Sequence, residues 1–279
     1  DTAVDDVALI AFTSGTTGRP KGVVYHHRGT YLEAVGNVLA WGMPAHPVYL
    51  WTLPMFHCNG WGGVYALTGM GGTHVVLRAV EAARIFELIA RENVTFACMA
   101  PAVLRTILDF PAQERPALTT RPRFTVAGAP PPAAFIERLE TELGWQFLQI
   151  YGLTETSPVL TVSQPDHNTA CEDWERRARA GVPALGVEIT LLDSEGNEVP
   201  RDDRTVGEVC ARSNGVSAGY YEQPDETQAA MRGGWFHTGD LGVWDEVGSV
   251  QLVDRQKDVI ISGGENISSP EIEAALYQH

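Results

Sequence analysis

The sequence has 279 residues, of which 44% are hydrophobic and 20% charged, as in an ordinary globular protein with one large or two smaller domains. Its formal net charge of −15 argues against a general nucleic-acid surface or an anionic membrane surface, because both attract basic patches. It has no apolar run of about 18 residues and no basic, apolar signal peptide at the start, so a cytoplasmic location is expected.

The first part of the chain alternates short apolar runs with segments of helical periodicity. Residues 7–12 predict a buried strand, and residues 29–41 predict a helix. Further strands are predicted at 48–53, 95–99, 124–127 and 146–150, and further helices at 82–91, from Pro101 onward, and at 133–143. This alternation predicts the α/β class, with a parallel sheet and flanking helices.

The pattern changes from about residue 181. Strands are predicted at 187–192, 207–212 and 249–253, and the turn-forming clusters at 193–197 and 245–248 indicate hairpins. We therefore expect an α/β subdomain over 1–180, a β-rich, barrel-like subdomain over 181–253, and a separate final segment over 254–279. The charged stretch 168–180 is expected to be a surface excursion.

The cysteines are too far apart in sequence to form a C-x-x-C pair, which argues against a structural zinc site and against a disulfide framework. Four buried thiols in a reducing compartment are expected instead. They are Cys58, Cys98, Cys171 and Cys210.

The loop 13–22, TSGTTGRPKG, alternates hydroxyl residues with glycine and has a lysine, Lys21, before its last residue. Glycines let backbone N–H groups approach a ligand closely, hydroxyls add donors, and Lys21 supplies a charge suited to phosphate. The Walker loop, G-x-x-x-x-G-K-[ST], does not fit. Counted from Gly15, its second glycine position holds Pro20, and Gly22 follows the lysine. On composition alone, a flexible glycine- and threonine-rich linker remains open.

Four segments, in order, resemble the signatures of the adenylate-forming (AMP-binding) superfamily, which includes acyl-CoA synthetases, firefly-luciferase-like enzymes and peptide-synthetase adenylation domains. They are TSGTTGRPKG (13–22), YGLTETSP (151–158), GWFHTGDLG (234–242) and DRQKDVIISGGENISSPEIE (254–273). The resemblance implies a two-step reaction. A carboxylate attacks the α-phosphate of ATP, giving acyl-AMP and pyrophosphate, and a thiol, commonly that of coenzyme A, then attacks the acyl carbon.

The resemblance also implies a nucleotide site. Lys21 is expected to act in catalysis and to hold the β- and γ-phosphates, and Glu155 to act in catalysis as the Mg²⁺ ligand. The other residues expected to bind ATP are Thr13, Ser14, Gly15, Thr16 and Thr17 in the loop, Thr154 on a phosphate, Tyr151 on one side of adenine with Gly128, Ala129 and Pro130 on the other, Gly152, and Asp240 and Arg255 on the ribose. Outside this context, Glu155 would be a solvated carboxylate and Asp240 a turn residue.

The segment 53–62, LPMFHCNGWG, bears on the second substrate. His57 resembles a catalytic histidine of the acyl pocket, and Trp61 resembles the tryptophan that gates the acyl tunnel in fatty-acyl-CoA synthetases. A structural histidine and a core tryptophan remain open for these two positions. Together with ISGGENISS, the segment resembles CoA ligases of medium-chain, short functionalised or aryl-propenoic acids.

Relatives in this superfamily carry an α/β subdomain before the matching region and, after it, a small domain with a lysine needed for adenylation. Both are expected to lie outside this chain, with Lys257 at the hinge between the large and small domains. The chain is therefore expected to be a fragment of the large domain that binds nucleotide weakly and adenylates little by itself. A homodimer, an adenylating enzyme that loads a carrier-protein thiol, and a non-catalytic nucleotide-binding module remain open.

Overall fold

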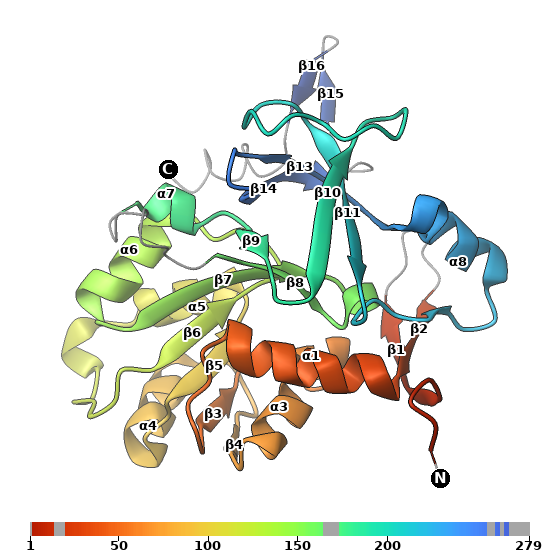
Figure 1. Cartoon of the computed structure of the whole chain (residues 1–279). Helices are drawn as coiled ribbons and strands as arrows, with labels where there is room; N and C mark the ends of the chain where they lie inside the picture. The colour runs from red at the N-terminus through yellow and green to blue at the C-terminus, as the bar shows by residue number, and fades with distance from the viewer. Residues whose placement is uncertain (1, 14–19, 164–172, 256–259, 263–264, 268–279) are drawn as a thin grey trace.

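The computed structural model describes residues 2–13, 20–163, 173–255, 260–262 and 265–267 (Figure 1). Its largest sheet has seven strands in the order β4-β3-β5-β6-β7-β8-β9. The first five of these are parallel, β8 is antiparallel to β7, and β9 is antiparallel to β8. In sheet order they are β4 (Thr73–Val76), β3 (Val48–Trp51), β5 (Phe96–Met99), β6 (Arg123–Val126), β7 (Gln146–Gly152), β8 (Val159–Ser163) and β9 (Val182–Pro183).

Two apolar clusters cover the two faces of this sheet. Alternate residues of a strand point to opposite faces, so Leu50 enters one cluster while Tyr49 and Trp51 enter the other. The first cluster is closed by α4 (Ala82–Glu92), α5 (Pro101–Leu108) and α6 (Ala133–Glu142). In α4 the apolar residues recur at helical spacing and are buried, which confirms the predicted helix. On the second face lie α1 (His27–Ala40), α2 (Cys58–Trp61) and α3 (Gly63–Gly69).

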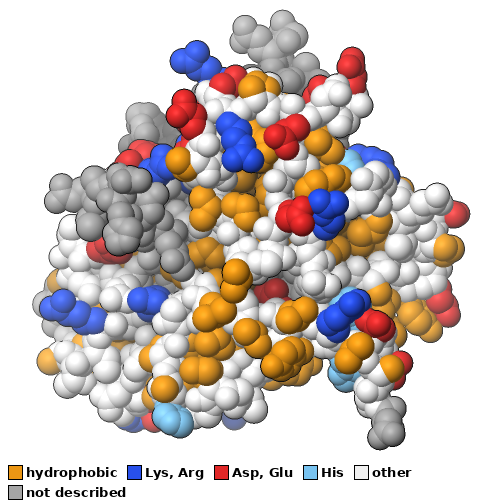
Figure 2. Space-filling view, viewed as in Figure 1, with side chains coloured by type: hydrophobic (Ala, Val, Ile, Leu, Met, Phe, Trp, Pro, Cys, Tyr) orange, Lys and Arg blue, Asp and Glu red, His pale blue; other side chains and the backbone are white. Residues whose placement is uncertain are grey.

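Helix α1 buries polar side chains and exposes apolar ones. Glu33 and Asn37 are buried, whereas apolar side chains point outward and gather on the face seen in Figure 2. The exposed apolar residues of this helix are Tyr31, Leu32, Val35 and Leu39. Helical spacing predicted the helix correctly, but hydrogen bonds of Glu33 and Asn37 join the apolar contacts of Ala34, Val38 and Ala40 in holding its inner face.

A second, four-stranded antiparallel sheet has the order β10-β11-β13-β14. It contains β10 (Val187–Leu192), β11 (Gly207–Ser213), β13 (Phe236–Trp244) and β14 (Val250–Arg255). Its core joins that of the large sheet, because Tyr151 and Leu160 pack in the same cluster as Leu191, Val209 and Trp244. The predicted order, an α/β part and then a β-rich part, is confirmed. Within the described strands this sheet stays open, with β10 and β14 at its edges, and does not close into a barrel.

The N-terminal strand corrects one expectation. β1 (Val7–Thr13) lies outside the parallel sheet, in a three-stranded antiparallel sheet with β2 (Lys21–His26) and β12 (Gly219–Tyr220). It is not a buried strand either: only Ala11 is buried, and Phe12 is 71% exposed. A short apolar run does not distinguish a central strand from the first arm of a hairpin.

The stretch 168–180 is only partly a surface excursion. Its described part contains the short helix α7 (Trp174–Arg177), in which Arg177 is buried against Glu140 of α6 through two hydrogen bonds. The remaining elements are η1 (Ala112–Glu114), η2 (Thr154–Thr156), α8 (Pro224–Ala230), η3 (Arg232–Gly234) and the hairpin β15 (Ile260–Ser262)–β16 (Glu265–Ile267). Among the described helices, none is long and apolar enough to cross a membrane.

Candidate functional site

The ends of the glycine-rich loop are fixed by the β1–β2 pairing, in which Thr13 lies opposite Lys21. Residues Ser14, Gly15, Thr16 and Thr17 lie outside the described residues. The Lys21 side chain is only 11% exposed, and its Nζ lies 2.6 Å from a carboxylate oxygen of Glu226 and 4.8 Å from the ring centre of Tyr220. The lysine is therefore held in place by an anion and an aromatic face.

Tyr220 connects the lysine to the predicted metal ligand. Its hydroxyl donates to Glu155 Oε1 over 2.9 Å, and the backbone N–H of Ser217 donates to the Glu155 carbonyl over 2.8 Å. Burial, and then the nearby Glu155 charge, raise the pKa of Tyr220, so this hydroxyl stays protonated as a donor. Three separate elements, β2, β12 and η2, thus bring Lys21, Tyr220 and Glu155 together.

Glu155 has the donor type that Mg²⁺ needs. Its side chain is half-buried, and its second oxygen, Oε2, makes no hydrogen bond with any described residue. Mg²⁺ takes hard oxygen ligands, usually one or two carboxylates together with phosphate oxygens. A carboxylate with a free oxygen close to a buried lysine fits a phosphate-bound Mg²⁺.

A second cluster surrounds Asp240. The Tyr151 hydroxyl donates to Asp240 Oδ2 over 2.7 Å, and Arg255 Nε lies 3.1 Å from Oδ1. Asp240 and Arg255 are direct partners in the β13–β14 pairing, which fixes their approach. Asp240 is only 6% exposed, and its burial raises the pKa of this carboxyl although Tyr151 and Arg255 oppose the shift. The structure therefore joins three residues that the sequence motifs predicted separately.

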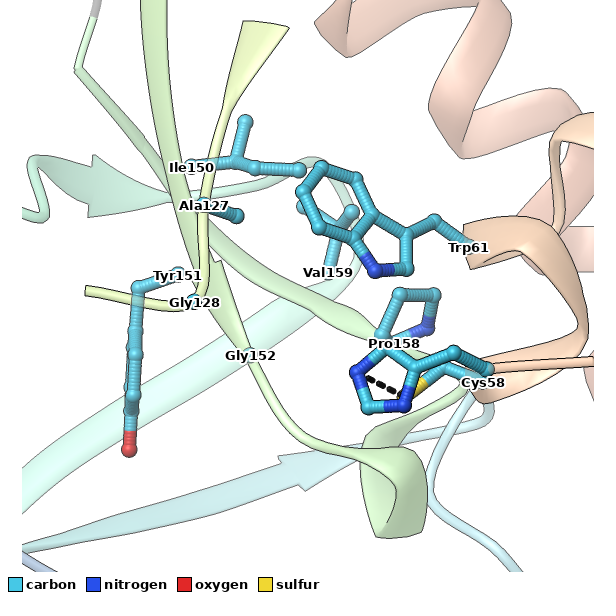
Figure 3. A pocket seen from close by; sticks show the side chains of 10 residues that line it. Cys58, Trp61, Ala127, Gly128, Ile150, Tyr151, Gly152, Pro158 and Val159 are labelled. Atoms are coloured by element: carbon cyan, nitrogen blue, oxygen red, sulfur yellow. Dashed lines mark hydrogen bonds between the residues drawn. The ribbon is translucent and has the colours of Figure 1, made fainter. Parts of the chain in front are cut away.

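Tyr151 and Gly128 lie on one side of a pocket at the ends of β6 and β7 (Figure 3). Gly152 follows in β7, and a Cβ atom there would lie 1.6 Å from the Pro158 carbonyl oxygen, so only glycine fits. Gly128 has a φ of 94° at the turn after β6. The residues Gly128, Ala129 and Pro130 are exposed and could form one wall of a ligand site beside Tyr151.

The other side of the pocket is a left-handed backbone turn. The five consecutive residues 58–62 all have φ between 47° and 68°, a conformation that costs about 1–2 kcal/mol per non-glycine residue. Such outliers gather at ligand sites. The turn places the buried Trp61 ring beside Ala127, Ile150 and Val159 (Figure 3).

The histidine and the threonine predicted for the site meet through a cysteine in this turn. His57 is exposed at the pocket, with Nε2 3.8 Å from the Cys58 sulfur, and the same sulfur lies 2.9 Å from Thr154 Oγ1. Thr154 also accepts a hydrogen bond from the Tyr25 hydroxyl at its carbonyl oxygen, over 2.6 Å. Thr154 therefore lies between this pocket and Glu155, its neighbour in η2.

The polar stripe of α1 supports the pocket wall. Asn37 donates to the Trp61 carbonyl over 2.8 Å, and Glu33 accepts from the Val159 N–H over 3.2 Å. Burial raises the pKa of the Glu33 carboxyl well above its ordinary value. Both contacts hold backbone that carries pocket-lining residues.

Glu33→Gln should remove a pH dependence of stability. Because the folded-state pKa is raised, the folded protein keeps a proton that the unfolded chain releases above about pH 4.3, so stability is lost as pH rises toward the folded pKa. Glutamine keeps an acceptor for Val159 and has no proton to lose. Urea unfolding should show a free energy of unfolding that falls between pH 5 and pH 8 by more in the wild type than in the variant, which keeps only the fall due to other buried carboxyls such as Asp240. An equal fall in both proteins would contradict this assignment.

Sequence reasoning missed Tyr220, Glu226, Glu33 and Asn37. Glu226 and Lys21 are 205 positions apart, and no local pattern connects them. Tyr220 reaches the site only because β12 pairs with β2, which a two-residue strand does not reveal in sequence. The sequence held one signal for Glu33 and Asn37: two polar residues four positions apart, on one face of a predicted helix.

Glu226→Gln should strengthen ATP binding about two- to fivefold, because the half-exposed Lys21–Glu226 pair competes with phosphate and exposed pairs contribute only about 0.2–1 kcal/mol. Isothermal titration calorimetry with ATP and Mg²⁺ measures the change. Glu246→Gln, in an exposed turn, is the control and should leave the affinity unchanged. Weaker binding by Glu226→Gln would show that this glutamate supports Lys21 rather than competing for it.

The arrangement brings together a largely buried lysine, a carboxylate with a free oxygen and a second carboxylate beside a tyrosine. The family model described as AMP-binding enzyme matches residues 1–221, and the chain belongs to this family. It is 45% identical over 276 residues to the probable acyl-activating enzyme 10 of Arabidopsis thaliana, an alignment that covers 96% of this chain and 50% of that protein.

Other relatives are named for their acids. The chain is 42% identical to the 2-methylpropanoate–CoA ligase CCL4 of Humulus lupulus, covering 98% of the chain and 50% of that protein. It is 39% identical to the peroxisomal trans-cinnamate:CoA ligase of Petunia hybrida, with 98% and 49% covered. The chain thus spans about half the length of the curated relatives it matches.

Two solved structures are similar to this chain over its whole length or nearly so. The O-succinylbenzoate coenzyme A synthetase of Bacillus subtilis, in complex with ATP and magnesium, superposes with a TM-score of 0.87 at 30% identity, covering 100% of this chain and 56% of that one. An amide bond synthetase of Marinactinospora thermotolerans gives 0.85 at 30% identity, with 98% and 54% covered.

Proposed function

We propose that this chain is the nucleotide- and acid-binding part of an ATP-dependent acyl-CoA synthetase. The overall reaction converts a carboxylic acid, ATP and CoA into acyl-CoA, AMP and pyrophosphate through an acyl-adenylate. The observation that carries the proposal is the convergence of Lys21, Tyr220 and Glu155 beside the pocket-forming turn, in a chain whose relatives include named CoA ligases.

The first half-reaction brings a carboxylate toward the anionic α-phosphate, so phosphate charge must be neutralised. Lys21, with the hydroxyl and backbone donors of loop 13–17, would hold the β- and γ-phosphates and lose its contact with Glu226 on doing so. Glu155 and the phosphate oxygens would hold Mg²⁺, which supplies further neutralising charge. Thr154, buried next to Glu155, would donate its hydroxyl to a phosphate oxygen in place of its present contact with Cys58.

The nucleoside half would lie on the second cluster. Asp240 would accept hydrogen bonds from the ribose hydroxyls, and Arg255, whose side chain is 56% exposed, would contact the same sugar. Adenine would lie between the Tyr151 ring and the exposed backbone of 128–130. The Tyr151 hydroxyl holds Asp240 in orientation through its 2.7 Å bond.

The acid would occupy the pocket between the left-handed turn and the ends of β6 and β7. Its described walls are mostly apolar, with Trp61, Ile150 and Val159 among them, so the acid should carry an apolar chain or ring. The exposed His57 at the pocket is the candidate for contact with the reacting carboxylate, and Trp61 for closing the acyl end. Relatives that take 2-methylpropanoate and trans-cinnamate, by their names, support acids of this range.

Coenzyme A is the proposed acceptor because the named relatives at 39–45% identity include CoA ligases. The similar amide bond synthetase is less identical, at 30%. A carrier-protein thiol and an amine are the rival acceptors, and comparing the three with one adenylated acid separates them.

The cytoplasmic location stays a prediction, because some relatives are named as peroxisomal. Fractionation of cells that contain the full-length protein tests it. A homodimer also stays a prediction, and light scattering tests it by measuring the molar mass in solution.

A pyrophosphate-release screen of the full-length protein, against acids of graded chain length and aromaticity, tests the proposed reaction. Release that depends on an apolar acid, followed by CoA-dependent consumption of the adenylate, is the expected result. A strong preference for amino acids, or no acid-dependent release while AMP still binds, would overturn it. The second outcome would leave a nucleotide-binding module without catalysis.

A further inference from the structure

A cluster of three different ligand types lies on the four-stranded sheet. Glu208 and Cys210 occupy alternate positions of β11, and Cys210 is the direct partner of His237 in β13. The Cys210 sulfur lies 3.3 Å from His237 Nδ1, which lies 2.7 Å from Glu208 Oε2. All three ligand atoms lie within 4.8 Å of one another. The predicted nucleotide and acyl sites use none of these residues.

A backbone hydrogen bond fixes the orientation of the Glu208 carboxylate. Glu208 Oε1 accepts from the Gly239 N–H over 3.1 Å, so its other oxygen is directed at His237. The side chains of His237 and Glu208 are only 10% and 13% exposed, and Cys210 is fully buried. The Gly239 N–H is the kind of outer hydrogen bond that orients a metal-ligating carboxylate in proteins.

We infer that Glu208, Cys210 and His237 form a binding site for a thiophilic divalent cation of the Zn²⁺ type. Sulfur, imidazole nitrogen and carboxylate oxygen are the ligands of protein-bound zinc. With tetrahedral bonds of about 2.0–2.3 Å, adjacent ligand atoms are about 3.3–3.5 Å apart, so Oε2 must retreat from His237 by about half an ångström. Sulfur and nitrogen donors also separate this site from the all-oxygen Mg²⁺ site proposed at Glu155.

Binding also requires changes of protonation and of one neighbouring side chain. The thiol proton of Cys210 passes to solvent as the metal–sulfur bond forms, and His237 carries its proton on Nε2 so that Nδ1 can coordinate. Arg232, whose side chain is 57% exposed, lies 3.1 Å from Glu208 Oε2 and must turn toward solvent. A water molecule then takes the fourth position. Among the described residues in contact with the cluster, the Arg232 guanidinium is the cation whose charge would repel a bound metal ion.

The competing explanation is a metal-free polar network, in which the His237 N–H simply donates to Glu208. Co²⁺ titration of the purified, metal-free 279-residue chain under a phosphine reductant separates the two, because a cobalt–thiolate bond gives a near-ultraviolet charge-transfer band. The band should saturate at one equivalent and disappear in Cys210→Ala. Cys58→Ala is the matched control, because Cys58 is also a buried thiol beside a histidine, His57. The cobalt band of the Cys58→Ala variant should equal that of the wild type.

Zn²⁺ competition against a chromophoric chelator gives the second readout, with circular dichroism to confirm folding. His237→Gln should weaken Zn²⁺ binding by about tenfold or more, in line with loss of one ligand. Arg232→Gln should tighten it by about three- to tenfold, because a positive charge is removed near the metal. Absence of a cobalt band in wild type, a band that survives Cys210→Ala, or a Zn²⁺ affinity indifferent to both His237→Gln and Arg232→Gln would overturn the site.

Discussion

Asp240→Asn should lose about 100-fold or more in affinity for both AMP and ATP, while the free protein becomes no less stable. Two hydrogen bonds from ribose hydroxyls to a charged carboxylate contribute about 1.5–3 kcal/mol each, and an amide offers only one acceptor atom. The loss should be the same for both nucleotides because the ribose is common to them. Calorimetric titration with AMP and with ATP plus Mg²⁺ measures it.

The stability half of this expectation follows from the direction of the Asp240 shift. Burial raises its folded-state pKa, so the unfolded chain ionises first, above about pH 3.9, and the wild type loses stability as pH rises toward the folded pKa. Asparagine removes that loss, so the stability advantage of the variant should be absent near pH 3 and present at pH 7.5. Asp225→Asn, on the exposed first turn of α8, is the control and should change neither binding nor this profile. Retained AMP binding by Asp240→Asn would refute the ribose assignment.

Lys21→Ala should lower ATP affinity by about 10- to 100-fold and leave AMP affinity nearly unchanged. Hydrogen bonds from a charged donor to phosphate contribute about 1.5–3 kcal/mol, and AMP has no β- or γ-phosphate to receive them. The same titrations measure the effect, with Arg212→Ala as a control that removes an exposed cation paired with Glu188. If ATP binding is unchanged, or if AMP binding falls equally, the phosphate-loop assignment is wrong.

The two substitutions probe the two halves of the site separately. The ratio of ATP to AMP affinity should collapse in Lys21→Ala and stay constant in Asp240→Asn. A single disordered or misfolded variant would lower both affinities and the unfolding midpoint together. The ratio therefore separates loss of a specific contact from loss of structure.

Local patterns predicted the α/β part well because its elements are set by local periodicity. The helix α4 and the strand β5 follow directly from apolar spacing and length. The strand β1 was misplaced because its own residues do not show that it pairs with β2, outside the parallel sheet. The same limit applies to α1, whose buried face depends on backbone groups of Trp61 and Val159 elsewhere in the chain.

The site divides in the same way. The motif residues Asp240, Tyr151 and Arg255 lie in contact in the structure, and their shared role on the ribose and adenine stays a prediction. Tyr220 and Glu226 could not be found, because they reach Lys21 only through the tertiary packing of β12 and α8. Long-range contacts of this kind leave no periodic trace in a single sequence.

The Tyr220 ring, placed against Lys21 and bonded to Glu155, gives the protein a built-in spectroscopic probe. Binding of a triphosphate would draw Lys21 away from the Tyr220 ring. A metal would polarise the Glu155 carboxylate, which accepts the hydrogen bond of the Tyr220 hydroxyl. A fluorine label introduced on tyrosine would then shift at this position, one of eight tyrosines in the chain. Each stage of nucleotide loading could thus be followed in solution, without any chemical turnover.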